Sequence, residues 1–91
     1  MSKGIYASSL NGLATLFTNI RNIEQMSGFL EDILTPQEII EIGERIELCR
    51  QLLQDKTQKE VAEQLGISVT TVNRWARILK FGTGTMKEVI Q

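Results

Sequence analysis

The chain has 91 residues, 42% apolar and 23% charged, with a formal net charge of −1, a composition typical of one small globular domain. A chain this short buries little surface when it folds alone, so oligomerisation is a common way to complete its core. Its single cysteine, Cys49, excludes an internal disulfide, and no apolar run approaches the roughly 20 residues that span a bilayer. Because the N-terminus also lacks the pattern of a secretory signal, we expect a cytoplasmic protein with no membrane partner.

Charge is divided unevenly along the sequence. Residues 1–50 hold four basic and seven acidic groups, a net of −3, whereas residues 51–91 hold six basic and four acidic groups, a net of +2. Local potential rather than total charge steers a polyanion, so the second half is the part expected to face phosphates. Short helices often differ by a few charges, however, and this asymmetry alone does not establish nucleic-acid binding.

Apolar spacing in the first third of the chain predicts two helices. One stripe of a helix over about residues 7–23 is formed by Tyr6, Leu10, Leu13, Phe17 and Ile20. A break is expected near Ser27 and Gly28. The short second helix that follows has as its apolar residues Met26, Phe29, Leu30, Ile33 and Leu34.

A third helix is predicted to begin at Pro36 and to run to about Gln54. Thr35 supplies a hydroxyl cap, proline suits the first helical position, and Glu38 can reach back to the cap. Its apolar residues form two faces, one with Ile39, Ile42, Ile46, Cys49 and Leu53, the other with Ile40, Leu48 and Leu52. A monomer of this size would struggle to cover both faces, so we expect a homodimer in which residues 1–55 supply the dimerisation helices.

The stretch from Thr57 to Trp75 has the spacing of a helix-turn-helix. Thr57 opens one helix, which stops at Gly66, and Ser68 caps the next, which reaches about Lys80. Ala62 is small enough to lie where the two helices touch, and Gly66 tolerates the positive φ of the turn. The apolar wedge between the helices is predicted to contain Val61, Leu65, Val72 and Trp75. A further capping pattern at Thr85 predicts a short final helix over 85–91, which makes six helices in one all-α domain spanning 1–91, with the helix-turn-helix at 57–80.

The outward face of the fifth helix carries side chains suited to DNA base edges. Val69, Thr70, Asn73 and Arg77 are short or hydrogen-bonding residues, unlike those of an apolar interface. The alternative is that the motif serves only for packing or dimerisation.

From about Leu34 to Gln91 the chain resembles the tryptophan repressor family. The resemblance rests on Leu34-Thr-Pro-Gln-Glu, Gly43-Glu-Arg-Ile, Leu52-Leu53, Thr57-Gln-Lys-Glu, Leu65-Gly66, Asn73-Arg74 and Leu79-Lys80. It implies a six-helix, intertwined dimer that binds double-stranded operator DNA through the helix-turn-helix. Residues 1–33 match only in pattern, as the helices with which that family interlocks its two subunits.

The resemblance also implies roles for individual residues. It makes Arg45 and Arg74 the pair that brackets the indole ring of a co-repressor, and it gives a DNA-facing set of Gln58, Lys59, Val69, Thr70 and Asn73. With Ser68, Thr71 and Arg77 added from the motif itself, these are the candidate DNA contacts. No cofactor is required, although L-tryptophan or another small aromatic or carboxylate effector is possible.

Two positions depart from the family pattern. Trp75 stands where the family has a glycine after the second arginine, and Ile78 replaces a serine that helps to hold the ligand. Trp75 has two interpretations: it fills the wedge as a core residue, or its own indole occupies the pocket and makes the protein independent of free tryptophan. Arg45 could equally form an ordinary salt bridge with Glu41 or Glu44 on its own helix.

Enzyme chemistry has no support in this sequence. The chain contains no histidine, no cluster of metal ligands and no glycine-rich phosphate loop, and Cys49 lies among apolar residues as a core side chain would. The favoured function is a sequence-specific transcription regulator, most simply a repressor that competes for its site. The alternatives are the DNA-recognition subunit of a mobile-element recombinase and a protein-interaction module that binds no nucleic acid.

Overall fold

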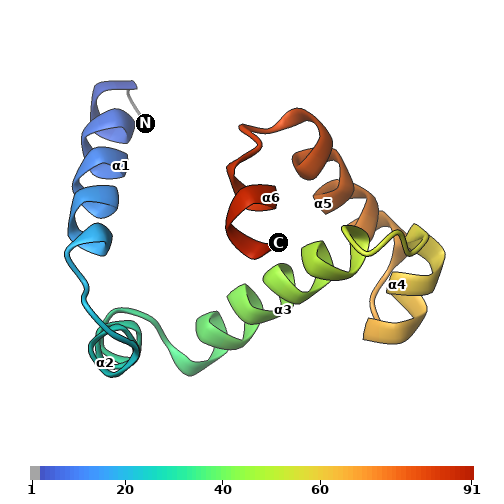
Figure 1. Cartoon of the computed structure of the whole chain (residues 1–91), viewed down its shortest axis with the longest axis horizontal. Coiled ribbons are helices and arrows are strands. Elements are labelled where there is room, and N and C mark those ends of the chain that lie inside the picture. Colours follow the sequence, from blue (N-terminus) through green and yellow to red (C-terminus); the bar gives the residue numbers. More distant parts are fainter. Residues whose placement is uncertain (1–2) are drawn as a thin grey trace. The chain divides into compact units, whose positions relative to one another are not determined.

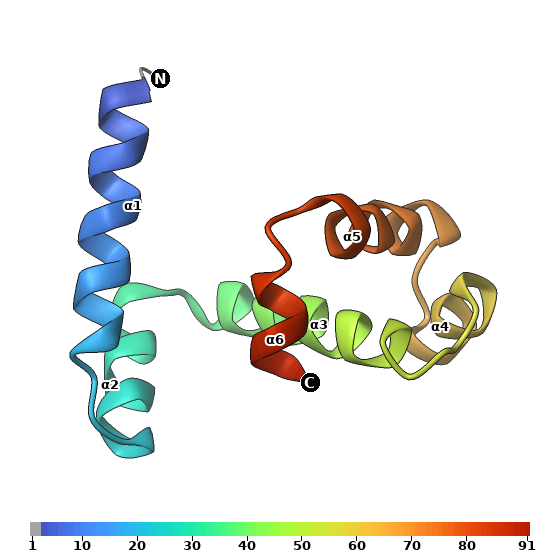
Figure 2. The same ribbon diagram turned by 45° about the horizontal axis from the view of Figure 1, so that its top comes forward.

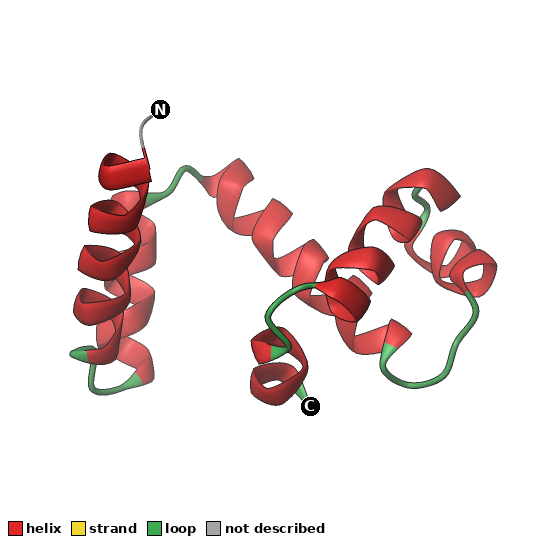
Figure 3. Ribbon diagram, turned by 90° about the horizontal axis from the view of Figure 1, so that it is seen from above, coloured by secondary structure: helices red, strands yellow, loops and turns green. Residues whose placement is uncertain are grey.

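The computed structural model describes residues 3–91 as helices joined by short loops, with no strand in that range (Figures 1 and 3). The six helices are α1 (Lys3–Thr18), α2 (Ile23–Ile33), α3 (Pro36–Leu52), α4 (Gln58–Leu65), α5 (Val69–Phe81) and α6 (Thr85–Ile90). The predicted all-α, six-helix class is confirmed. The chain divides into two compact units, the first ending at Pro36 and the second spanning Gln37–Gln91, so a single domain over 1–91 stays a prediction.

The first unit corrects the predicted boundary between its two helices. α1 ends at Thr18 rather than near Ile23, and Thr18 Oγ1 donates to the carbonyl of Thr15 at 2.8 Å. α2 begins at Ile23 because Asn22 caps it: the Asn22 Oδ1 accepts from the backbone N–H of Gln25 at 2.8 Å. The expected break at Ser27 and Gly28 was therefore wrong, and both residues lie inside α2. A glycine within a helix costs only about 1 kcal/mol of helix stability. A good N-cap and a packed apolar face together stabilise the helix by more than that.

An aromatic pair joins α1 to α2. The rings of Phe17 and Phe29 lie edge to face, with centroids 5.4 Å apart and planes at 83°. The rest of the predicted α1 stripe is uncovered, since Tyr6 is 62% exposed and Leu10 is 53% exposed. In the described part of α1 no side chain is buried. The apolar stripe of α1, formed by Tyr6, Leu10, Leu13 and Phe17, is thus available for another surface.

The core of the second unit lies where α3, α4 and α5 meet. It contains Leu48 and Cys49 of α3, Val61 and Ala62 of α4, and Val72 of α5. Leu65 and Trp75 pack against these residues, so the predicted wedge of the helix-turn-helix is confirmed. α6 turns back on the same core through Met86 and Ile90 (Figure 2).

α3 begins at the predicted proline and ends at Leu52, slightly before the predicted Gln54. Only its C-terminal part is buried. Towards its N-terminus Ile40 is 54% exposed, and Ile42 and Ile46 are also exposed, so apolar surface is left uncovered as the two-faced pattern predicted. No helix formed by residues 3–91 is both long and apolar enough to cross a membrane.

α6 exists as predicted, but its cap differs from the prediction. Thr85 is the first helical residue rather than the cap, and Gly84 occupies the cap position with φ +86°. The hydroxyl of Thr83 accepts from the backbone N–H of Thr85 at 3.2 Å. One N–H at the start of α6 is therefore satisfied by a hydroxyl that precedes the glycine, a contact that the capping pattern in the sequence did not indicate.

Candidate nucleic-acid interface

Local caps and one glycine turn fix the relation of α4 to α5. The hydroxyl of Thr57 accepts from the backbone N–H of Glu60 at 3.1 Å, and the hydroxyl of Ser68 accepts from that of Thr71 at 3.1 Å. Gly66 ends α4 in the left-handed conformation, φ +68° and ψ 35°, and the next N–H, that of Ile67, donates to the carbonyl of Ala62 at 3.1 Å. The turn between the helices is therefore determined by two side-chain caps and one left-handed glycine.

One face of α5 is free of core contacts and carries the side chains predicted to read DNA. At 3.6 residues per turn these positions fall within about 100° of one another around the helix, and the buried Val72 lies outside this arc. All of them are exposed: Val69, Thr70, Asn73 and Arg77. The structure thus brings the predicted base-facing residues together, and we refer to them as the recognition face.

The start of α4 adjoins this face through a hydrogen bond between helices. Nδ2 of Asn73 donates to Oε1 of Gln58 at 3.3 Å. Gln58 is half-buried and the neighbouring Lys59 is exposed, as a phosphate contact would require. Nothing in the sequence indicated the contact between Gln58 and Asn73, because it depends on the angle at which the helices cross.

Ser68 and Thr71 lie at the start of α5 with their hydroxyls 2.8 Å apart. Thr71 lines a groove together with Arg74 and Trp75, so it lies on a different side of α5 from Asn73. The Ser68 hydroxyl caps α5 and also bonds to the Thr71 hydroxyl, and the contact of both residues with DNA stays a prediction.

The groove beside α5 has a volume of about 680 Å³ and brings together Arg45, Arg74 and Trp75. The guanidinium carbon of Arg45 is 5.4 Å from the centroid of the Trp75 ring, and that of Arg74 is 5.9 Å from it. Trp75 also packs against the core, as the wedge interpretation predicted, and its ring contacts both arginines. That this ring makes the protein independent of free tryptophan stays a prediction. Arg45 on α3 thus contacts a ring on α5. The alternative from the sequence, a salt bridge to Glu41 or Glu44 on its own helix, did not include this contact.

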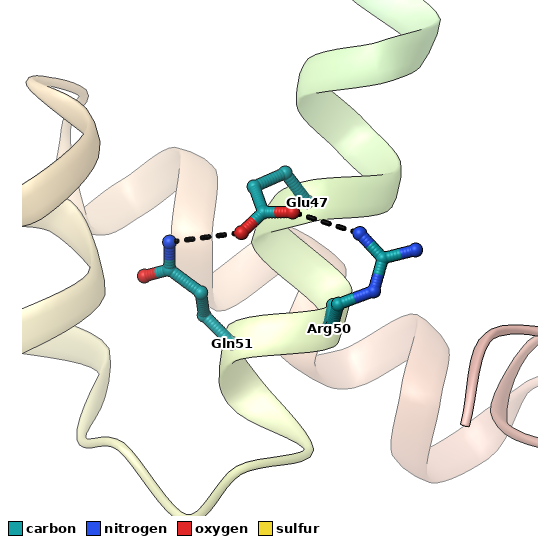
Figure 4. A network of polar contacts seen from close by, with 3 residues as sticks. All are labelled: Glu47, Arg50 and Gln51. Carbon is teal, nitrogen blue, oxygen red and sulfur yellow. Dashed lines mark hydrogen bonds and ion pairs between the residues drawn. The ribbon is translucent and has the colours of Figure 1, made fainter.

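The α3 wall of the groove is acidic, with Glu41, Glu44 and Glu47. Glu47 accepts from Nε2 of Gln51 at 3.3 Å and from Nη1 of Arg50 at 2.8 Å (Figure 4). The hydrogen bond from Gln51 and then that from Arg50 hold the pKa of the Glu47 carboxyl below its ordinary value. These carboxylates do not form a metal site: across residues 3–91, no three side chains of the His, Cys, Asp and Glu types gather to hold an ion.

Comparisons with known proteins find one family model and two similar proteins. The family model described as "Trp repressor protein" matches residues 8–91. A "Trp operon repressor homolog" from Aliivibrio salmonicida (strain LFI1238) is 28% identical over 88 residues, which cover 96% of this chain and 82% of that protein. The "Uncharacterized protein YerC" from Bacillus subtilis (strain 168) is 27% identical over 73 residues, which cover 80% of this chain and 70% of that protein.

A solved structure shares the fold described above. The crystal structure of a TrpR like protein from Eubacterium eligens ATCC 27750 superposes with a TM-score of 0.79 at 26% sequence identity, covering 90% of this chain and 84% of the other. The family model spans all but the first residues of the chain, including the helix-turn-helix and the groove. The protein therefore belongs to the Trp repressor family of non-enzymatic regulators.

Proposed function

We propose that this protein is a sequence-specific DNA-binding transcription regulator, acting as a repressor by occupying its operator. The observation that carries the proposal is the exposed recognition face on α5, in a chain of the Trp repressor family, with Asn73 supported from α4 by Gln58. A packing module would expose an apolar surface there, whereas three of the four residues on this face have hydrogen-bonding or charged side chains.

The recognition face suits the major groove of double-stranded DNA. An amide such as that of Asn73 can make paired hydrogen bonds to adenine, and the hydroxyl of Thr70 can serve several bases. Lys59 is an exposed cation that suits phosphate, where it adds affinity without sequence preference. Binding blocks the site for other proteins, and no catalytic step is needed.

Dimerisation follows from the apolar surface that neither unit covers by itself. The α1 stripe and the exposed isoleucines of α3 lie in the part of the chain that carries no recognition residue. A second copy offers the same surfaces, and a two-fold dimer would cover both and present two α5 helices. Recognition helices about 34 Å apart reach successive major grooves on one side of the duplex.

The experiment that tests this proposal is selection of bound duplexes by the full chain from a random-sequence pool. We expect enrichment of an inverted repeat whose half-sites lie about one helical turn apart, with affinity that falls steeply with salt. A recombinase subunit would select a site without needing two-fold symmetry. Failure to enrich any sequence, together with salt-independent or absent retention of DNA, would refute DNA binding and favour an interaction module.

A further inference from the structure

The contact of Trp75 with Arg45 links the recognition helix to α3. Arg45 extends from α3, Trp75 from α5, and the guanidinium lies 5.4 Å from the ring centroid, within the range at which a cation is attracted to an aromatic face. Arg74, next to Trp75 in the sequence, lies 5.9 Å from the same ring. One indole is thus the common partner of two cations from two helices.

The same indole is fixed on its other side by the core. Trp75 is half-buried and packs against the cluster that contains Leu48, Cys49, Val61 and Val72. It also forms part of the groove wall with Arg45 and Arg74, so the cationic part of the groove already has an aromatic partner. A free aromatic molecule in this groove would compete with a ring attached to the chain for the same two guanidinium groups.

The position of the ring bears on the recognition face because α5 is one continuous helix. Trp75 lies two residues after Asn73 and fewer than two turns after Thr70, so any rotation of α5 against α3 moves the ring and the recognition face together. The Ser68 cap and the bond from Asn73 to Gln58 hold the start of the same helix. α5 is therefore joined to α4 through Asn73 and to α3 through Trp75.

We propose that Trp75 is a built-in aromatic group that takes the place of a free aromatic effector, so that α5 is held ready for operator DNA without a small molecule. This inference rests on the proposed DNA-binding function. Trp75 acts as a positioning residue: it contacts Arg45 and the core, and it acts on DNA through the placement of Asn73 and Thr70.

The decisive test is chemical rescue in the full chain. Trp75→Gly removes the ring, and we expect it to weaken binding to the duplex selected by the native protein by at least about tenfold. Free indole at millimolar concentration should restore most of that affinity by occupying the vacated space, as small apolar molecules do in cavities left by truncation. The native protein should give no heat with L-tryptophan in calorimetric titration, and L-tryptophan should change its operator affinity by less than about tenfold.

A volume control separates positioning from simple packing. Trp75→Leu keeps an apolar plug but loses the aromatic face, whereas Trp75→Phe keeps an aromatic face. We expect the Phe variant to bind the operator more tightly than the Leu variant, with both as helical as the native chain by circular dichroism. These two variants decide the matter if Trp75→Gly fails to fold. A Leu variant that binds within about twofold of the native protein would overturn the inference and leave the proposed function intact.

Matched arginine variants provide a measurement that needs no DNA. Trp75 is the only tryptophan of the chain, so fluorescence emission reports on this ring alone. Arg45→Ala should shift the emission and weaken operator binding, whereas Arg50→Ala, also an exposed arginine of α3 but paired with Glu47, should do neither.

Unchanged emission in Arg45→Ala, absence of indole rescue in a folded Trp75→Gly, or micromolar L-tryptophan binding that tightens operator DNA would each overturn the inference. If the native protein enriches no duplex at all, the proposed function falls and this inference falls with it.

Discussion

Asn73 on α5 donates a hydrogen bond to Gln58 on α4 at 3.3 Å, so the amide proposed to read a base is oriented by the preceding helix. The bond uses one of the two N–H groups of Asn73 and leaves the other N–H and the carbonyl oxygen free. One donor beside one acceptor is the pattern that adenine recognition requires in the major groove. Under the proposed function, the two helices of the motif would therefore act together at one position of the operator.

Asn73→Ala should cost on the order of 1–3 kcal/mol of operator affinity and relax the preference at one base pair. Gln58→Ala should cost less but relax the same base pair, because Asn73 stays present and loses only its support. Competition binding against single-base operator variants measures both effects. As a control, Lys59→Ala should weaken binding to all sequences alike and lower the salt slope by about one. If Gln58→Ala relaxed a different base pair from Asn73→Ala, the two residues would not act together.

The uncovered stripe of α1 should make unfolding depend on protein concentration, because dimer dissociation accompanies unfolding. Leu13→Glu places a charge on that stripe and should shift the molar mass measured by light scattering from dimer to monomer. Ser8→Glu, on the opposite side of the same helix, is the matched control and should leave the mass unchanged. A native protein that is monomeric at micromolar concentration with its helices intact would contradict the dimer.

Glu47 should contribute stability that depends on pH. Its pKa is lower in the folded protein than in the unfolded chain, so the contribution is fully present above the ordinary carboxyl pKa and is lost as pH falls through the lowered value. Glu47→Gln should therefore reduce the loss of unfolding free energy between about pH 6 and pH 3, measured by urea denaturation. Glu63→Gln on the exposed part of α4 is the control. Equal acid sensitivity in the native and Glu47→Gln proteins would show that the contacts with Gln51 and Arg50 do not persist in solution.

Cys49 should be unreactive in the folded protein. The side chain is fully buried, and burial raises the pKa of its thiol, so the fraction present as thiolate near neutral pH is small. Iodoacetamide should modify the protein only as fast as it unfolds, and modification followed by mass spectrometry should speed up in urea. Rapid labelling without denaturant would mean that the core of the second unit opens readily.

Gly66→Ala tests the turn of the helix-turn-helix. The glycine has φ +68° and no heavy atom within 4 Å of an added Cβ, so the cost comes from backbone conformation alone, about 1–2 kcal/mol of unfolding free energy. Gly43→Ala is the matched control, since it lies inside α3 with equally open space and should stabilise by about 0.5–1 kcal/mol. Denaturant melts of the two variants should move in opposite directions. A neutral Gly66→Ala would mean that the turn relaxes out of the left-handed region.

Local signals account for the parts of the fold that could be predicted from the sequence. Pro36, Thr57, Gly66 and Ser68 each determine a helix end through neighbouring backbone groups, and the structure has these ends as predicted. The break before α2 was missed because an apolar stripe continued through it as far as Ile20, while the deciding interaction was the Asn22 cap. Residues close in sequence were therefore enough to predict a helix end wherever the capping residue was identified correctly.

The details of the site depend on contacts between helices, which no spacing rule supplies. The recognition face could be predicted because all its members lie on one helix. The bond between Asn73 and Gln58 and the approach of Arg45 to Trp75 depend on how α3, α4 and α5 cross. For Trp75 the sequence left two interpretations open, and the structure shows that a ring large enough to fill the wedge also reaches the guanidinium groups.

The core of the second unit also has a consequence for how quickly the protein folds. All of its buried apolar residues lie between Leu48 and Val72, so only short loops must close before they meet. Helical domains dominated by such local contacts fold in microseconds to milliseconds. The helix-turn-helix should thus form early in folding or synthesis, whereas the proposed pairing of two chains through α1 would require a bimolecular encounter. If the protein acts as the proposed dimer, the pairing step rather than the folding of the second unit would set, at low expression, how soon a new molecule can act.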